Sequence, residues 1–198
     1  MKRLVLLLFM CPFLQGLAQD EKVFEKYTAE KMYTIDGGSV VVSKIVENIE
    51  GSKEDIYTRA KSYLARAYND SKSVIQTDDK ESGVIIGKGL YTGLASFNLG
   101  AWTMKAYHIL RVDIKEGRAR IICSASTVIP NSSAHLDNEY EYSIINYYPI
   151  TDKRAPSLLK KHQLRAFISL VDEMNKSVLS LEKALKEGGV LDSEKDNW

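Results

Sequence analysis

The amino-acid sequence predicts an α+β protein in which an antiparallel sheet carries helices on one face. Three observations support this fold class. Residues 104–125 alternate apolar and polar side chains with a period of two, as paired strands do. Residues 53–68 and 161–186 instead repeat apolar side chains every three or four positions, as amphipathic helices do. The third observation is the order: a strand, a helix, consecutive strands and a long final helix, which favours an antiparallel sheet with helices on one side.

The strands are predicted from β-branched and alternating segments. Residues 39–46 are almost continuously apolar, which indicates a first strand buried on both faces. Short strands are expected at 73–77 and 83–89, and the glycines of the second are typical of a bulge or of a close approach by another backbone. Residues 104–114 and 118–125 predict the clearest hairpin. Its apolar side is expected to comprise Met104, Ala106, His108, Leu110, Val112, Ile114, Ala119, Ile121, Cys123 and Ala125.

The first helix, 53–68, has a recognisable start. The Ser52 hydroxyl can accept a hydrogen bond from a first-turn amide, and Glu54 and Asp55 lie at the positive end of the helix dipole.

The C-terminal helix is predicted over 161–186 and ends at Gly188 and Gly189. At about 1.5 Å per residue it approaches 40 Å, which is enough to cross a whole sheet. We expect its apolar stripe to cover the sheet, and a dimer seam is the alternative. The stripe comprises Leu164, Phe167, Val171, Met174, Val178, Leu181 and Leu185.

The N-terminal residues predict an exported protein. Lys2 and Arg3 precede a short apolar run, and the small residues before Gln19 form a cleavage site after Ala18. The run is shorter than the about 20 apolar residues that span a bilayer. A lipoprotein signal at Cys11 is the alternative, although Met10 replaces the small residue that such a signal requires. The mature protein is therefore expected in the periplasm or outside the cell, without a transmembrane segment.

This gives four regions along the chain. Residues 1–18 are the signal peptide, 19–38 an N-terminal extension, 39–186 a single α+β domain, and 187–198 a polar tail. Within the domain, residues 130–160 are expected to be loop-like. They contain three prolines and the tyrosines Tyr140, Tyr142, Tyr147 and Tyr148.

The charge balance argues against a nucleic-acid partner. The full chain has 27 Lys and Arg against 26 Asp and Glu. Loss of Lys2 and Arg3 with the signal peptide would leave a formal net charge of −1. Nucleic-acid-binding domains usually have a clear basic excess.

Three segments of the chain, 52–60, 74–89 and 112–120, resemble a known family. The most specific is VIQTDDKESGVIIGKG at 74–89. Together they are similar to the bacterial domain of unknown function 4468 family, described as having a TBP-like fold, over about residues 40–128. The resemblance implies an exported protein with a curved antiparallel sheet. It implies no activity, cofactor or functional residue, and Ala119 departs from the aromatic residue expected there.

Cysteine and histidine positions predict neither a reactive thiol nor a metal centre. Cys123, the only cysteine beyond the signal peptide, lies in an apolar alternating stretch and is expected to be a buried, inert thiol. His108 lies in the middle of a strand on the apolar side, so we expect a hydrogen-bonded core histidine. His135 and His162 are expected to be solvated. None of the histidines has a partner at the local spacing typical of metal motifs.

An acidic turn offers carboxylates that could bind calcium. Asp78, Asp79 and Glu81 lie close together, but Lys80 interrupts the alternation of oxygen ligands, so a solvated turn is expected.

A catalytic triad is not expected either. Ser124 and Ser126 lie near the hairpin that contains His108 and Asp113, but strand alternation places that histidine and that carboxylate on opposite faces. A basic run around the start of the last helix could bind an anion, and we expect it instead to be solvated. It comprises Lys153, Arg154, Lys160, Lys161 and Arg165.

The second face of the hairpin is the candidate binding site. Tyr107, Ile109, Arg111, Arg120 and Ile122 should cluster there, opposite the helices. Apolar patches rimmed by charge are typical of interaction sites, unless the tyrosine-rich loop 130–150 covers this one. The sequence therefore predicts a non-enzymatic binding or interaction module for an unknown protein or small ligand. The alternatives are an unrecognised enzyme with a site in 130–160 and a structural component of the cell envelope.

Overall fold

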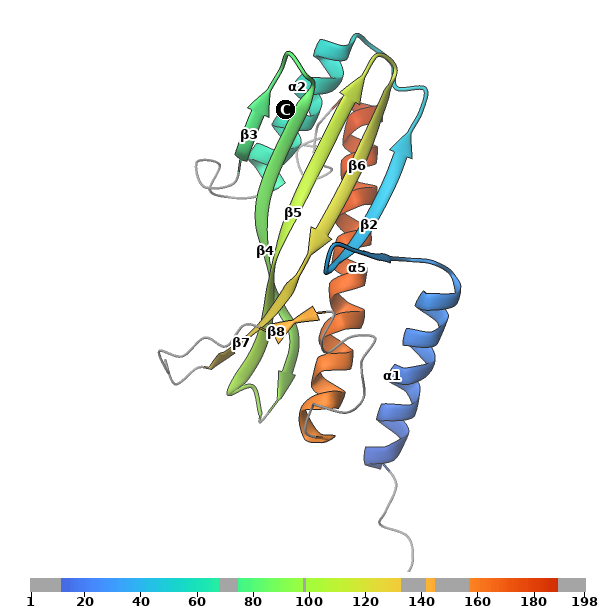
Figure 1. Ribbon diagram of the computed structural model, residues 1–198, viewed down its shortest axis with the longest axis vertical. Helices are drawn as coiled ribbons and strands as arrows, with labels where there is room; N and C mark the ends of the chain where they lie inside the picture. The colour runs from blue at the N-terminus through green and yellow to red at the C-terminus, as the bar shows by residue number, and fades with distance from the viewer. Residues whose placement is uncertain (1–11, 68–74, 98, 133–141, 145–156, 189–198) are drawn as a thin grey trace, which may run out of the picture.

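The computed structural model describes residues 12–67, 75–97, 99–132, 142–144 and 157–188. Figure 1 shows a long sheet beside a long C-terminal helix. The elements in chain order are α1 (Pro12–Ala29), β1 (Thr34–Asp36), β2 (Ser39–Val46), α2 (Lys53–Ala67), β3 (Ile75–Asp79), β4 (Val84–Phe97), β5 (Trp102–Lys115), β6 (Arg118–Ala125), β7 (Thr127–Ser132), β8 (Tyr142–Ser143) and α5 (Ser157–Glu187).

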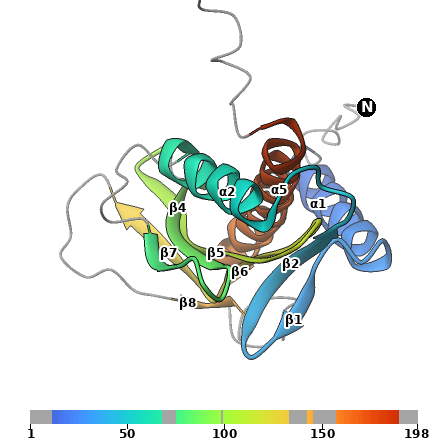
Figure 2. The same cartoon turned by 90° about the horizontal axis from the view of Figure 1, so that it is seen from above.

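The strands form an antiparallel sheet, as the alternation predicts. Its order is β1-β2-β6-β5-β4-β3, and every neighbouring pair is antiparallel. β7 pairs with the first part of β5 and with β8. Seen from above, α1, α2 and α5 lie on one side of the sheet (Figure 2). The predicted fold class is therefore confirmed.

The core lies between the sheet and helices α2 and α5. Leu110, Val112 and Ile121 are completely buried, each on the side that the helices cover. The whole predicted stripe of α5 is also buried, and α5 contacts β2, β4 and β6. These side chains are thus already used within the chain, so a dimer through this helix would need its other face. Dimerisation itself stays a prediction.

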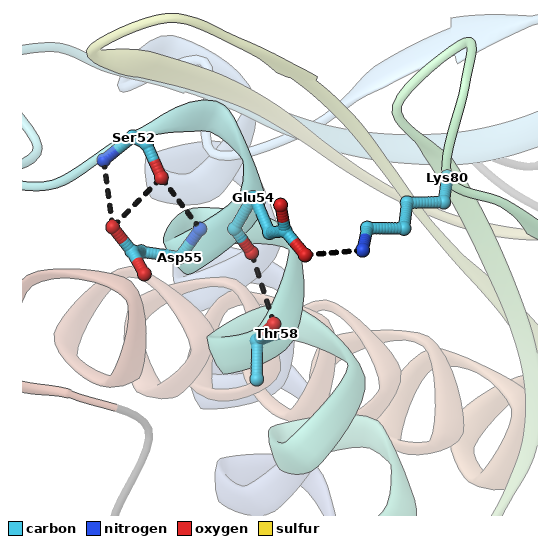
Figure 3. Close-up of polar contacts among 5 residues, drawn as sticks. All are labelled: Ser52, Glu54, Asp55, Thr58 and Lys80. Carbon is cyan, nitrogen blue, oxygen red and sulfur yellow. Dashed lines mark hydrogen bonds and ion pairs between the residues drawn. The ribbon is translucent and has the colours of Figure 1, made fainter.

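The start of α2 is held by a reciprocal cap, which Figure 3 shows. The Asp55 backbone N–H donates to Ser52 Oγ (3.2 Å), and the Ser52 N–H donates to Asp55 Oδ2 (2.9 Å). The predicted serine cap is confirmed, and Asp55 closes it from the third helical position as in a capping box. Glu54 adds an ion pair to Lys80 in the β3–β4 turn. The cap therefore fixes where α2 begins, and the ion pair links this end of the helix to the β3 edge of the sheet.

The prediction that the first strand is buried on both faces is wrong. In β2, Val42 and Val46 are buried under the helices, whereas Ile45 on the opposite face is 62% exposed. A β-branched residue is favoured on a pleated strand whether or not its face is covered. Apolar content alone therefore could not distinguish one covered face from two.

β4 runs to Phe97, well beyond the predicted 83–89. Its register against β5 shifts between Tyr91 and Ala95, where an irregularity lets the strand continue beyond the predicted end. The expected close approach occurs at Gly83, just before the strand. There φ is +75°, and a Cβ would lie 2.6 Å from the Ile114 carbonyl oxygen.

The N-terminal extension has structure of its own. Helix α1 packs along α5, where the Tyr27 hydroxyl donates to Asp172 (2.6 Å) and Arg165 donates to Asp20 (2.7 Å). The expectation that Arg165 is simply solvated is therefore wrong. Lys153 and Arg154 lie outside the described residues, as does most of 130–160. Over the described residues, no helix is both long and apolar enough to cross a membrane.

Candidate functional site

One face of the sheet is not covered by α1, α2 or α5, and we call it the open face. Strand register brings the predicted residues together there: Ile109 lies opposite Ser124, and Arg111 opposite Ile122. Tyr107, two positions along β5, is 41% exposed. The structure thus places Tyr107, Ile109, Arg111, Arg120 and Ile122 on one face, whereas their role in binding stays a prediction. Most of the 130–150 loop, the alternative cover for this face, lies outside the described residues.

Asp113 organises the two arginines of the open face. It accepts hydrogen bonds from Arg111 Nε (2.7 Å) and from Arg120 Nε and Nη2 (2.9 and 2.6 Å). Partial burial alone would raise the pKa of Asp113, but the hydrogen bonds from Arg120 and Arg111 outweigh burial and lower it. Because one carboxylate faces two guanidinium groups, the cluster keeps a net positive charge and N–H donors directed at solvent.

A hollow of about 310 Å³ lies beside Tyr107. Lys88 on β4 places its ammonium group 4.4 Å from the centre of the Tyr107 ring, a cation–π contact. This contact holds a positive charge and an aromatic surface at the same place. The hollow is lined by Ser39, Lys88, Tyr107, Ile109, Ser124, Ala125, Ser126 and Thr127.

A second hollow, of about 260 Å³, lies at the other end of the open face. It combines the exposed Ile45 of β2 with basic side chains from the β5–β6 turn, and we call it the basic hollow. Lys115 and Arg118 have no ion-pair partner within the described part of the chain. The lining residues are Ile45, Asp113, Lys115, Arg118, Ala119 and Arg120.

Two groups often used in acid–base or nucleophilic chemistry, His108 and Cys123, lie in the core instead. His108 is buried and stacks on Tyr91 with ring centroids 3.7 Å apart, and burial lowers its pKa to about 4. Burial likewise raises the pKa of the Cys123 thiol to about 12, which confirms an inert thiol. His108 and Asp113 are on opposite faces of β5, so they cannot form a triad with Ser124.

Two polar expectations need correction. His162 is partly buried instead of fully solvated: its ring lies 4.9 Å from that of Phe97, and burial, with Arg165 and Lys161 nearby, lowers its pKa. Packing against β4, which local sequence does not reveal, accounts for the difference. His135 lies outside the described residues.

The acidic turn is not merely solvated. The Tyr57 hydroxyl of α2 donates to Asp78, and Lys61 pairs with the same carboxylate at 2.6 Å. Hydrogen bonds from Lys61 and Tyr57 lower the pKa of Asp78. Asp79 accepts from the Ser82 N–H (3.0 Å). The turn therefore docks on α2, and the described residues contain no cluster of three or more His, Cys, Asp or Glu suited to a metal ion.

Fold and surface together define an α+β protein whose helices back one side of an antiparallel sheet. Residues 43–124 match the family model described as "Domain of unknown function (DUF4468) with TBP-like fold". The resemblance deduced from the sequence is therefore confirmed over this stretch.

Solved structures share the same fold. A TBP-like protein from Parabacteroides distasonis ATCC 8503 is 15% identical, with a TM-score of 0.57 over 77% of this chain and 97% of that chain. A DUF4468 family protein from Bacteroides ovatus ATCC 8483 is 16% identical, with a TM-score of 0.56 over 76% of this chain and 90% of that chain. At these identities the likeness concerns the fold alone. A comparison with curated proteins finds no match.

Proposed function

We propose that this protein is a non-enzymatic interaction module that binds an acidic protein partner through the open face of its sheet. The observation that supports this most directly is the exposure of apolar and aromatic side chains among basic ones. Tyr107 and Ile45 are exposed on a face that the three helices do not cover, and Arg111 and Arg120 are held between them by Asp113. Aromatic residues and arginine are the types most enriched where proteins bind one another.

The chemistry of the partner follows from the charge of the open face. The side chains that β4, β5 and β6 place there include Lys88, Arg111, Lys115, Arg118 and Arg120, against the carboxylate of Asp113. A surface with this excess attracts a negatively charged partner and repels a basic one. The isoleucines and Tyr107 add apolar area that a purely ionic ligand would not use.

Photo-crosslinking in cells that naturally produce the protein tests this proposal. A photoreactive phenylalanine analogue replaces Tyr107 on the open face. The matched control replaces Leu179, which is 53% exposed on α5. We expect a specific crosslinked protein from position 107 that is absent from position 179 and is lost when Ile109→Asp is added. Crosslinks of equal yield from both positions, or none from position 107, would overturn the proposal.

We further propose that the protein acts after export. The basic start, the short apolar run and the small residues before Gln19 support a signal peptide. Asp20, Phe24 and Tyr27, which contact α5, all lie beyond the proposed cleavage point and would remain in the mature chain. Cell fractionation with N-terminal sequencing is expected to find a mature chain that starts at Gln19 outside the cytoplasm. An uncleaved cytoplasmic chain would contradict export.

A further inference from the structure

We propose that the acidic partner binds as an extended strand along the free edge of β2, with its carboxylates in the basic hollow. This inference rests on the proposed function and specifies how the partner binds. It depends on two separate features, an unpaired strand edge and a neighbouring hollow of suitable charge.

The first feature is the outer edge of β2. One edge of β2 pairs with β6 over residues 40–46, whereas the other pairs with the short β1 only over residues 39–41. Within the described part of the chain, no strand pairs with that outer edge over 42–46. Unpaired N–H and C=O groups along a strand edge are a template for another strand. In strand addition, main-chain hydrogen bonds provide affinity and alternate side chains provide specificity.

The side chains of β2 leave this edge accessible. A lysine on an edge strand often blocks pairing with another chain, but Lys44 lies on the helix side and pairs with Glu182 of α5 at 2.5 Å. Its ammonium group is thereby held against the helix. Ile45, on the open face, is exposed and offers an apolar contact to a neighbouring strand.

The second feature is the basic hollow beside this edge. From β2, Ile45 lines the hollow, and it lies directly opposite Arg120 of β6. Side chains of an added strand that face the same way would lie about 5 Å from Ile45. A glutamate at that position of the added strand can reach toward Arg120 and Arg118. The two positive charges of these arginines exceed the single negative charge of Asp113.

The same charges argue against a second copy of this chain as the occupant. Pairing of β2 with its own copy would bring two basic hollows together across the new strand pair. Their arginines lie on β6, one strand inward from the new pair, so the two positive hollows would repel each other across it, most strongly at low ionic strength. An acidic extended segment has the complementary charge, and its alternating apolar residues would cover the edge of the core.

Nuclear magnetic resonance titration of the isotope-labelled protein tests strand addition, because it detects binding as weak as millimolar. The probe is a short peptide of alternating valine and glutamate. One comparison peptide replaces glutamate by lysine, and another keeps the glutamates but has N-methylated amides on one edge. We expect amide shifts over residues 42–46 and around Arg118 and Arg120, and at least about tenfold weaker binding of the N-methylated peptide, because it loses several hydrogen bonds.

Matched protein variants separate the charge from the strand edge. Arg118→Glu is expected to weaken binding of the glutamate peptide about fivefold, as for an exposed ion pair that is reversed. Lys26→Glu on α1 makes the same charge change at a distant, 63% exposed side chain and is expected to leave binding unchanged.

Three results would overturn the inference: no shifts in β2, equal binding of the N-methylated peptide, or equal binding of the lysine peptide. The proposed function would survive each of them if position 107 still crosslinked its partner in cells. Conversely, peptide binding at β2 without a crosslink from position 107 would support strand addition and contradict the role of the wider open face.

Discussion

At the scale of single residues, His108 shows how burial changes chemistry. Its imidazole lies under the helices against Tyr91, and desolvation lowers its pKa from 6.5 to about 4. The folded protein therefore binds this proton less readily than the unfolded chain does. Stability that depends on a neutral His108 is fully present above about pH 6.5 and is lost as the pH falls toward 4.

This predicts a fall in the free energy of unfolding of about 2 kcal/mol between pH 7 and pH 5. His108→Phe should remove most of the fall, because phenylalanine keeps the ring stacking and does not titrate. Denaturant titrations of both proteins at the two pH values measure it. Carboxylates titrate mainly below this range, and His162, whose pKa is also lowered, accounts for a smaller remainder. An unchanged pH dependence in the variant would contradict the assignment to His108.

Gly83 shows a second residue-scale constraint, which is the space that a side chain needs. Gly83 and Gly117 both have positive φ, at +75° and +67°, but only a Cβ at Gly83 would meet the Ile114 carbonyl oxygen. We predict that Gly83→Ala destabilises the protein by clearly more than the about 1 kcal/mol expected where only the backbone is strained. Gly117→Ala is the matched control. Thermal unfolding of both variants measures the difference, and equal losses would mean that the close contact can relax.

At the scale of elements, α1 is held to the rest of the molecule by a few identifiable contacts. Phe167 of α5 lies between the rings of Phe24 and Tyr33, with centroids 5.7 and 5.0 Å away in edge-to-face geometry. Such pairs contribute about 0.5–1.5 kcal/mol beyond the area that they bury. α1 is therefore expected to open more easily than the sheet.

The corresponding prediction concerns Phe24→Ala. Hydrogen exchange of α1 amides from residue 20 onward should accelerate about tenfold, in line with the loss of one aromatic pair. Exchange in β5 and β6 should stay unchanged. Lys26→Ala, an exposed position on the same helix, is the control. Faster exchange throughout the sheet would show that α1 and the core unfold together.

Elements also differ in how well their sequence predicts them. α2 was predicted to within one residue, because apolar spacing and the Ser52 cap are local signals. α5 was predicted over 161–186 from its apolar spacing and begins four residues earlier, at Ser157. β4 was predicted too short, because the shift between Tyr91 and Ala95 breaks its alternation while pairing with β5 continues. The bounds of such a strand depend on its partner and not on its own residues.

At the scale of the whole molecule, the helices decide which side of the sheet is core. Ile121 and Ile122 are chain neighbours of the same type on opposite faces: Ile121 is completely buried, and Ile122 lies on the open face. We predict that Ile121→Asp prevents folding, because a carboxylate in the core is strongly unfavourable. Ile122→Asp should remain folded, as circular dichroism and thermal unfolding would show. Unfolding of both variants would mean that the open face is itself core, and with it the proposed interaction surface would fail.

The candidate site was predicted in part for the same reason. Alternation in the hairpin correctly grouped Tyr107, Ile109 and Arg111 on one face, because a strand's period of two is a property of its own backbone. The link from Asp113 to both arginines, the cation–π contact of Lys88 and the exposed Ile45 were missed. The Asp113–Arg120 and Lys88–Tyr107 contacts join residues of different strands, whose register only pairing establishes. The exposure of Ile45 depends on which face of β2 the helices cover.

The amino-acid sequence alone thus specifies the fold class, the two main helices and the composition of each face of the hairpin. These features follow from periodicity and helix caps within short segments. Which face is covered depends on how α1, α2 and α5 pack, whereas the free edge of the sheet and the charges that meet on its surface depend on how the strands pair. Those facts arise from contacts between residues far apart in the chain, and no local pattern encodes them.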